Sequence, residues 1–153
     1  MINIIKADKS NIDKAYMIRL EAMCVINNLA DDLQLSEDFK TNTMEYLSRQ
    51  DQTTLLAIND KNEAVGCMTI CYINIMPTVC HPSGKRAHLM NVYINKDYRR
   101  QGIAQKMLEL LIDEARHRGV TEISLDATEM GKLLYKKCGF YKNEDGMLLR
   151  LNN

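Results

Sequence analysis

The chain has 153 residues, of which 46% are hydrophobic and 26% charged, with 20 basic and 20 acidic side chains. This length fits one domain over residues 1–153, and the zero formal net charge argues against nucleic acid or an anionic membrane surface as a partner. An odd number of cysteines without a C-x-x-C pair, no secretory signal and no long apolar run together predict a reduced cytoplasmic protein with no membrane span.

The first half of the chain predicts two helices between strands. The expected elements are a strand at 2–7, helices at 12–28 and 36–49, and strands at 53–58 and 64–75. Ser10 and Ser36 each precede acidic residues at a helix start, which predicts side-chain caps at both positions. The strand at 64–75 is apolar on both faces, so we expect it near the centre of the sheet.

The second half predicts further strands and helices in alternation. The expected elements are a strand at 87–94, a helix at 103–118, a strand at 122–127, a helix at 128–138, and strands at 140–141 and 147–151. The complete order, βααβββαβαββ, is mixed α/β. The loop 76–86 holds both prolines of the chain, and its length favours a functional role. Cys80 and His81 are adjacent but lack further spaced ligands, so no metal site is expected.

The strand–turn–helix unit over residues 89–115 carries the clearest chemical signal. The first backbone N–H groups of a helix lack partners and carry partial positive charge. Gly102 allows close approach to this backbone, and Arg99 and Arg100 add charge, so a diphosphate fits. An ordinary strand-to-helix turn with two solvated arginines is the alternative. A P-loop or a dinucleotide-binding fold is disfavoured, because their motifs are incomplete here.

Two motifs resemble those of a known family. Arg99-x-x-Gly102-x-Ala104 resembles the (Arg/Gln)-x-x-Gly-x-(Gly/Ala) acyl-CoA pyrophosphate loop of the GNAT N-acetyltransferase superfamily. Residues 134–140, Leu-Tyr-Lys-Lys-Cys-Gly-Phe, resemble that family's closing Leu-Tyr-x-x-x-Gly-Phe segment, and one strand-like run separates the two motifs. The resemblance implies a GNAT-type mixed central β-sheet flanked by helices. It also implies acetyl-CoA as the acyl-donor co-substrate and direct attack by an amine.

The resemblance further implies a set of cofactor-binding residues. The fourth and fifth strands are expected to splay, so that pantetheine binds the backbone of Asn91, Val92, Tyr93 and Ile94. The Val92 N–H would polarise the thioester carbonyl. The other implied residues are Arg99, Arg100, Gln101, Gly102, Ile103, Ala104, Gln105, Thr128, Lys132 and Tyr135. A plain strand interior at 91–94 and a solvated Lys132 are the alternatives, and Thr128 replaces an asparagine frequent in the family.

Two residues are the candidate catalytic groups. Tyr135 matches the family's usual general acid, which would protonate the departing thiolate. His88 precedes Arg99 by eleven residues, where several family members carry a glutamate base, and histidine accepts a proton near neutral pH. Strand alternation would place His88, Met90 and Val92 on one face. Alternatively, Tyr135 is a core aromatic and His88 is a hydrogen-bonded residue at a strand end.

The amine acceptor, a small molecule or a peptide, is the least defined part of the interpretation. In the family, the first two helices and the loop before the fourth strand line the acceptor side. Here these segments hold the loop 77–86 and five acids: Glu21, Asp31, Asp32, Glu37 and Asp38. The acids would attract a cationic amine, although solvated helix starts explain some of them equally well.

Two further questions stay open at this point. Many relatives pair, so a homodimer is compatible with the resemblance, although no residue requires one. The competing function is a non-catalytic acyl-CoA-binding sensor or interaction module of the same fold. Retention of Tyr135 favours the enzyme over that module.

Overall fold

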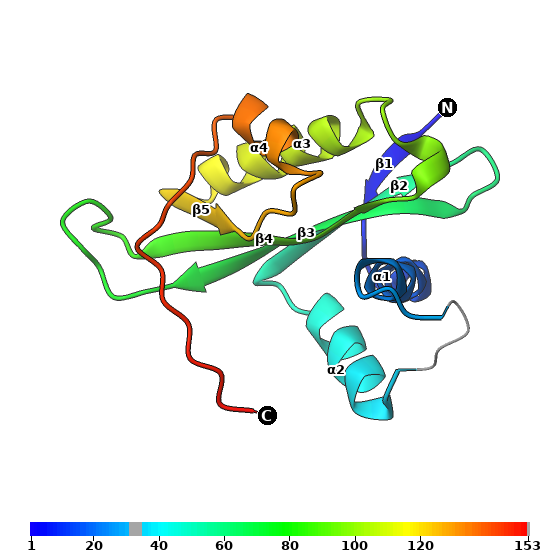
Figure 1. Cartoon of the computed structure of the whole chain (residues 1–153), viewed down its shortest axis with the longest axis horizontal. Helices are drawn as coiled ribbons and strands as arrows, with labels where there is room; N and C mark the ends of the chain where they lie inside the picture. The colour runs from blue at the N-terminus through cyan, green and yellow to red at the C-terminus, as the bar shows by residue number, and fades with distance from the viewer. Residues whose placement is uncertain (31–34, 153) are drawn as a thin grey trace.

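A five-stranded sheet lies at the centre of the computed structural model, which describes residues 1–30 and 35–152 (Figure 1). In sheet order, the strands are β1 (Asn3–Lys6), β2 (Gln52–Ile58), β3 (Ala64–Asn74), β4 (Lys85–Ile94) and β5 (Glu122–Leu125). The first four strands pair antiparallel, and β5 pairs parallel to β4. The sheet is therefore mixed, with β3 at its centre, as the sequence predicts.

Helices cover both faces of this sheet. They are α1 (Ile12–Ile26), α2 (Glu37–Leu47), the short 3-10 helix η1 (Lys96–Tyr98), α3 (Ile103–His117) and α4 (Lys132–Lys137). Figure 1 shows α1 and α2 on one face and α3 and α4 on the other. The apolar stripe predicted for α3 is buried, from Ile103 through Leu108 and Leu111 to Ala115. Two separate hydrophobic clusters therefore sandwich the sheet.

A β-bulge interrupts β4 where it runs beside β3. Thr69 pairs with Met90, but Cys67 pairs with Tyr93, so two residues of β4, Asn91 and Val92, fall between these pairs where β3 has one. Asn91 has a φ of 56°, a left-handed conformation that asparagine tolerates better than most residues. The bulge changes which face each later side chain of β4 occupies.

The bulge overturns the expectation that His88, Met90 and Val92 share one face. Leu89 packs in the cluster on the α3 side, so His88 and Met90 point to the α1–α2 side. Beyond the extra residue the alternation reverses, and Val92 packs against the cluster on the α3 side. The simple strand period fails here because the backbone of Asn91 is left-handed.

β5 ends where its pairing with β4 ends. Their register begins with Arg86 opposite Glu122 and ends with Leu89 opposite Leu125. β4 continues to Ile94, and no described strand pairs with that continuation on the β5 side. The edge of β4 beyond Leu89 is therefore without a strand partner in the described sheet, and the splay of the two strands stays a prediction.

The two strands predicted at 140–141 and 147–151 are not formed, so the sheet ends at β5. Phe140 instead completes the end of α4, because its N–H donates to the Tyr135 carbonyl and its ring packs edge-on against Tyr135. Residues 147–151 lie against no neighbouring strand, and the side chain of Met147 is 99% exposed. Leucine, methionine and arginine have no strong strand propensity, so an apolar run here does not specify a strand.

Local signals were right at some helix ends and wrong at others. Ser36 caps α2 as predicted, since its Oγ accepts a hydrogen bond from the Phe39 N–H at 3.1 Å. Asn11 rather than Ser10 precedes α1, and neither side chain caps it, because the Ser10 hydroxyl bonds Asp8. α4 begins four residues later than predicted, at Lys132, after a turn.

Among the described helices, none combines the length and apolarity that crossing a bilayer requires.

Candidate active site

The loop before α3 presents unbonded backbone amides. Arg100 and Gly102 have positive φ values of 63° and 77°. Among the described residues, the backbone N–H groups of residues 100–105 have no hydrogen-bond acceptor, and the first bond into the helix is Lys106 N–H to the Gly102 carbonyl. A Cβ atom added to Gly102 would meet nothing within 4 Å. The loop is therefore an open anion-binding concavity at a helix N-terminus.

Arg99 ties this loop to the end of β4. Its Nε donates to the Ile94 carbonyl at 2.8 Å, and Nη1 lies 3.8 Å from the Met130 sulfur in the segment before α4. Arg100 is exposed, and neither arginine pairs with a carboxylate among the residues that the structure describes. Arg99 therefore positions the loop, and both guanidinium groups leave a positive charge beside the unbonded amides.

The segment before α4 packs closely around Tyr135. A Cβ on Gly131 would lie 2.8 Å from the Tyr135 ring, so only glycine fits there without a shift. Thr128 Oγ1 accepts a hydrogen bond from the Gly131 N–H at 3.3 Å, which closes the turn that leads into the helix. Lys132 is exposed and its Nζ pairs with Glu129 at 2.6 Å. The structure thus gives Thr128 and Lys132 local contacts of their own.

Tyr135 is 8% exposed and belongs to the same hydrophobic cluster as Leu89 and Ile94 of β4. Burial raises the pKa of its phenol above the ordinary value near 10. The hydroxyl therefore stays protonated throughout the neutral range. Tyr135 is therefore a core aromatic, and its role as the general acid stays a prediction that a protonated hydroxyl is compatible with.

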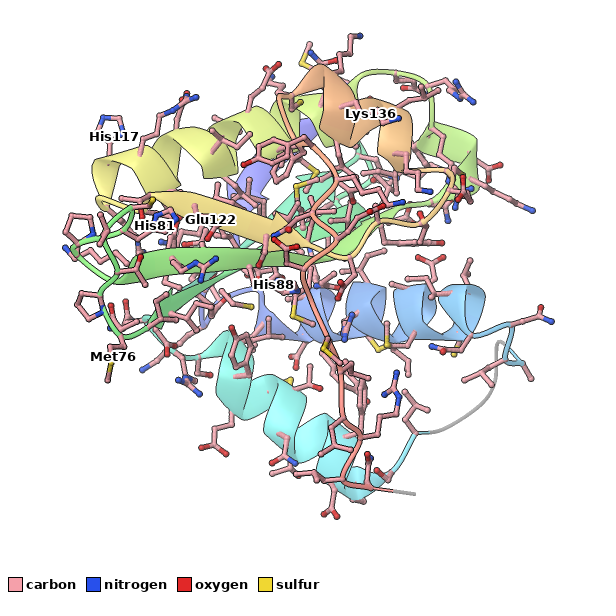
Figure 2. The ribbon with its side chains drawn as sticks, turned by 60° about the vertical axis from the view of Figure 1, so that its left-hand side comes forward. Met76, His81, His88, His117, Glu122 and Lys136 are labelled. Carbon is pink, nitrogen blue, oxygen red and sulfur yellow. The ribbon has the colours of Figure 1, made fainter. Side chains whose placement is uncertain are left out.

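His88 is held at the junction of β4 and β5. Its Nδ1 lies 2.7 Å from Ser124 Oγ, and its Nε2 lies 4.0 Å from an exposed carboxylate oxygen of Asp126. Figure 2 shows it part-way along the sheet, whereas His81 and Glu122 lie together near one end. His88 is partly exposed, so its ring can exchange protons with solvent.

A cavity of about 460 Å³ opens on the other face of the sheet, beside the bulge. Its lining comes from α1, α2, β3 and β4: Arg19, Phe39, Asn42, Thr43, Tyr46, Leu47, Thr69, Cys71, Met90 and Asn91. Met90 and Asn91 lie where β4 has left β5, so the cavity borders the open part of that strand.

The charge of this cavity differs from the sequence-based expectation. Among the described residues, no carboxylate lines it. Glu21 instead accepts a hydrogen bond from Asn95 at 3.1 Å, and Glu37 and Asp38 form the exposed first turn of α2. Asp31 and Asp32 lie outside the described residues. The loop 77–86 does not line the cavity, because His81 bonds Thr121 at the far end of β4.

Arg19 is the cavity residue that the sequence analysis missed. It follows Ile18 on the face of α1 that buries Ala15, Ile18 and Ala22. Its Nη1 donates to the Asn91 Oδ1 at 3.2 Å. A charged residue on an otherwise buried helical stripe is a readable signal, because such a position needs a polar partner.

Comparison with known proteins accounts for this combination of loop, open strand edge and closing helix. The family model described as the acetyltransferase (GNAT) family matches residues 20–140. This chain belongs to the GNAT acetyltransferase family. The match includes both sequence motifs and all of β2 to α4, so the family assignment and the N-acetyltransferase class follow together.

Individual relatives of this GNAT protein differ in what their names say they act on. The chain is 24% identical to glucosamine 6-phosphate N-acetyltransferase of Arabidopsis thaliana over 134 residues, which cover 88% of this chain and 86% of that protein. It is 28% identical to human N-acetyltransferase 8 over 114 residues, covering 72% of this chain but only 48% of the human protein.

A solved structure extends the likeness to the whole fold. A protein from Clostridium acetobutylicum, described as a predicted acetyltransferase and crystallised with acetyl-CoA, superposes with a TM-score of 0.84 at 26% identity. The match covers 99% of this chain and 97% of that chain. The GNAT architecture, with its mixed five-stranded sheet, is therefore confirmed.

In this GNAT acetyltransferase, replacing Gly102 should weaken coenzyme A binding specifically. Gly102→Ala places a methyl group in the open space above the unbonded amides and strains a backbone with a φ of 77°. Gly119→Ala is the matched control, since Gly119 ends the same helix, also has a φ of 77°, and its Cβ would make ordinary contacts. We expect both variants to lose about 1–2 kcal/mol of unfolding free energy, measured in urea.

Calorimetric titration with coenzyme A separates the two effects. Gly102→Ala should lower the affinity by about tenfold or more, the loss expected when one or two charge-assisted hydrogen bonds are disturbed. Gly119→Ala should bind like the parent protein. Equal affinities for both variants would show that this loop does not hold the coenzyme.

Proposed function

We propose that this protein transfers the acetyl group of acetyl-CoA to an amine held in the cavity between α1, α2 and β4. One observation carries the proposal. The unbonded amides around Gly102 stand at the end of β4, and that strand runs between the slot left by β5 and the acceptor cavity. A coenzyme whose diphosphate binds those amides can extend its pantetheine along the open edge of β4.

The open edge of β4 supplies backbone groups for the pantetheine and the thioester. Among the described strands, none pairs with β4 on this side beyond Leu89, so the backbone groups of Asn91 and Val92 on this edge suit a ligand. The family resemblance extends the pantetheine contacts to Tyr93 and Ile94. The Val92 N–H lies in the bulge, and we assign it to the thioester carbonyl, whose oxygen gains negative charge as the amine attacks. Arg99, Arg100 and the backbone of residues 101–105 hold the diphosphate in this proposal.

Direct transfer requires one bond to form, one to break and two protons to move. The amine nitrogen attacks the thioester carbon, the tetrahedral adduct expels the coenzyme thiolate, and the amide forms. Tyr135 gives its proton to that thiolate, so free coenzyme A leaves as a thiol. Burial raises the pKa of the Cys71 thiol in the cavity, which keeps it protonated and disfavours an acyl-cysteine intermediate.

His88 is the proposed acceptor of the proton that the amine loses. It points to the cavity side of the sheet, two residues before the cavity residue Met90. Its Nδ1 bonds Ser124, which orients the ring. Since His88 itself does not line the cavity, the proton would reach it through water.

The proposal is tested by thiol release from acetyl-CoA with a panel of amino sugars, amino acids, polyamines and peptides. At least one amine should accelerate release, and Tyr135→Phe should then lower kcat by about 10²- to 10⁴-fold with little change in coenzyme affinity. Since the pKa of the phenol is raised, the part of kcat that depends on a protonated Tyr135 should persist to at least pH 10. It should fall above that pH. Tyr141→Phe is the control, because Tyr141 is 88% exposed.

Two results would contradict this assignment. Coenzyme binding with no amine-dependent thiol release across the panel would favour a non-catalytic acyl-CoA-binding module. An unchanged kcat in Tyr135→Phe would show that another group protonates the departing thiolate.

The role of His88 predicts a change in pH dependence rather than a uniform loss. His88→Ala should lower the rate at neutral pH far more than at high pH, where the amine is already deprotonated. Ser124→Ala keeps the ring but removes its Nδ1 partner, and should give a smaller effect of the same shape. Parallel pH–rate profiles for His88→Ala and the parent protein would remove His88 from the mechanism.

A further inference from the structure

The arginines of this protein fall into two groups. Four of them pair with carboxylates: Arg49 with Asp51, Arg86 with Glu122, Arg116 with Asp113, and Arg118 with Glu114. Among the described residues, four have no carboxylate within ion-pair distance: Arg19, Arg99, Arg100 and Arg150. Two of these stand at the loop assigned to the coenzyme diphosphate, and Arg150 lies on the exposed C-terminal segment.

Arg19 is different, because it is half-buried in the acceptor cavity. The hydrogen bond that it makes within the described residues goes to the neutral amide oxygen of Asn91, at 3.2 Å. A guanidinium has five N–H donors and stays charged at neutral pH. Half-buried charges are normally paired, since taking a charge out of water is costly. The remaining donors of Arg19 therefore adjoin a cavity that no carboxylate lines in the described part of the chain.

We infer that the acceptor is a small primary amine that also carries a phosphate or carboxylate group, and that Arg19 binds this anionic group. The inference rests on the proposed function, because it names the substrate class of the same cavity. An arginine fork matches both anions in a bidentate way. Asn42, Thr43 and Thr69 add amide and hydroxyl groups to the lining. A volume of about 460 Å³ suits a small molecule rather than a length of folded protein.

Paired acceptors that differ only in the anionic group test this inference. One pair is glucosamine 6-phosphate and glucosamine, and the other is alanine and alaninamide. Parent protein should prefer the anionic member of one pair about ten- to hundredfold in kcat/KM, mainly through KM. The two pairs show whether Arg19 binds a phosphate or a carboxylate group.

Three variants isolate the charge of Arg19. Arg19→Gln should reduce the preference at least tenfold, and Arg19→Lys should keep much of it, since the charge remains. Arg116→Gln removes an exposed arginine of α3 that is 74% accessible at its side chain, and should keep the parent ratio. Comparing the ratio of each pair between a variant and the parent protein cancels the difference in intrinsic amine reactivity between the two members. An unchanged ratio in Arg19→Gln, or a parent preference for the neutral members, would overturn the inference.

A binding measurement separates this inference from the proposed function. The same compounds are titrated into protein saturated with coenzyme A, and heat is recorded without turnover. Binding of an anionic member that Arg19→Gln abolishes supports the Arg19 site even if no amine releases thiol. Absence of binding for every anionic member, or binding independent of Arg19, contradicts it.

Discussion

The left-handed turn of Asn91 is the constraint on which both halves of the site depend. Its side chain accepts hydrogen bonds from Arg19 at 3.2 Å and Cys67 at 3.4 Å, and it donates to Thr69 at 3.1 Å. Thr69 in turn bonds Thr54 of the next strand. This buried polar network holds a strained backbone in one conformation, which a single loop residue could not maintain alone.

In the proposed function, the bulge lets one strand serve two ligands. Before it, β4 pairs with β5, and beyond it the strand edge is open toward that side. The side chain of Asn91 lines the acceptor cavity on the α1–α2 face, while Val92 packs against the α3-side cluster. An acyl donor and an acceptor could therefore approach the same peptide group from different directions, which is the geometry that direct transfer needs.

The far end of α3 is anchored so that its N-terminus is fixed. Glu114 accepts hydrogen bonds from Thr53 of β2 and Tyr72 of β3, and it pairs with Arg118 and Lys6. Although burial opposes it, these hydrogen bonds and charges hold the pKa of Glu114 below its ordinary value. Because a helix is rigid, fixing this end of α3 also fixes the other end, at Gly102. The unbonded amides therefore have a fixed direction.

The sequence was sufficient for features set by local periodicity. The α3 stripe, the turn at Gly102 and the Ser36 cap depend on neighbours within one helical turn, and each was predicted correctly. The bulge was not predictable, because it arises from the register between β3 and β4, and a one-residue slip reverses the face of every later side chain. Glu37 and Asp38 do not line the cavity, which agrees with the alternative that a helix start carries acids whether or not it faces a ligand.

Arg19 shows how such a failure can still be informative. A count of charged residues ignores where each charge lies. A charge on the buried stripe of α1 must be compensated within the fold or by a ligand. Exposed acids at the start of α2 need no such compensation. In the proposed function, the uncompensated charge of Arg19, rather than its residue type, indicates which chemical group the cavity binds.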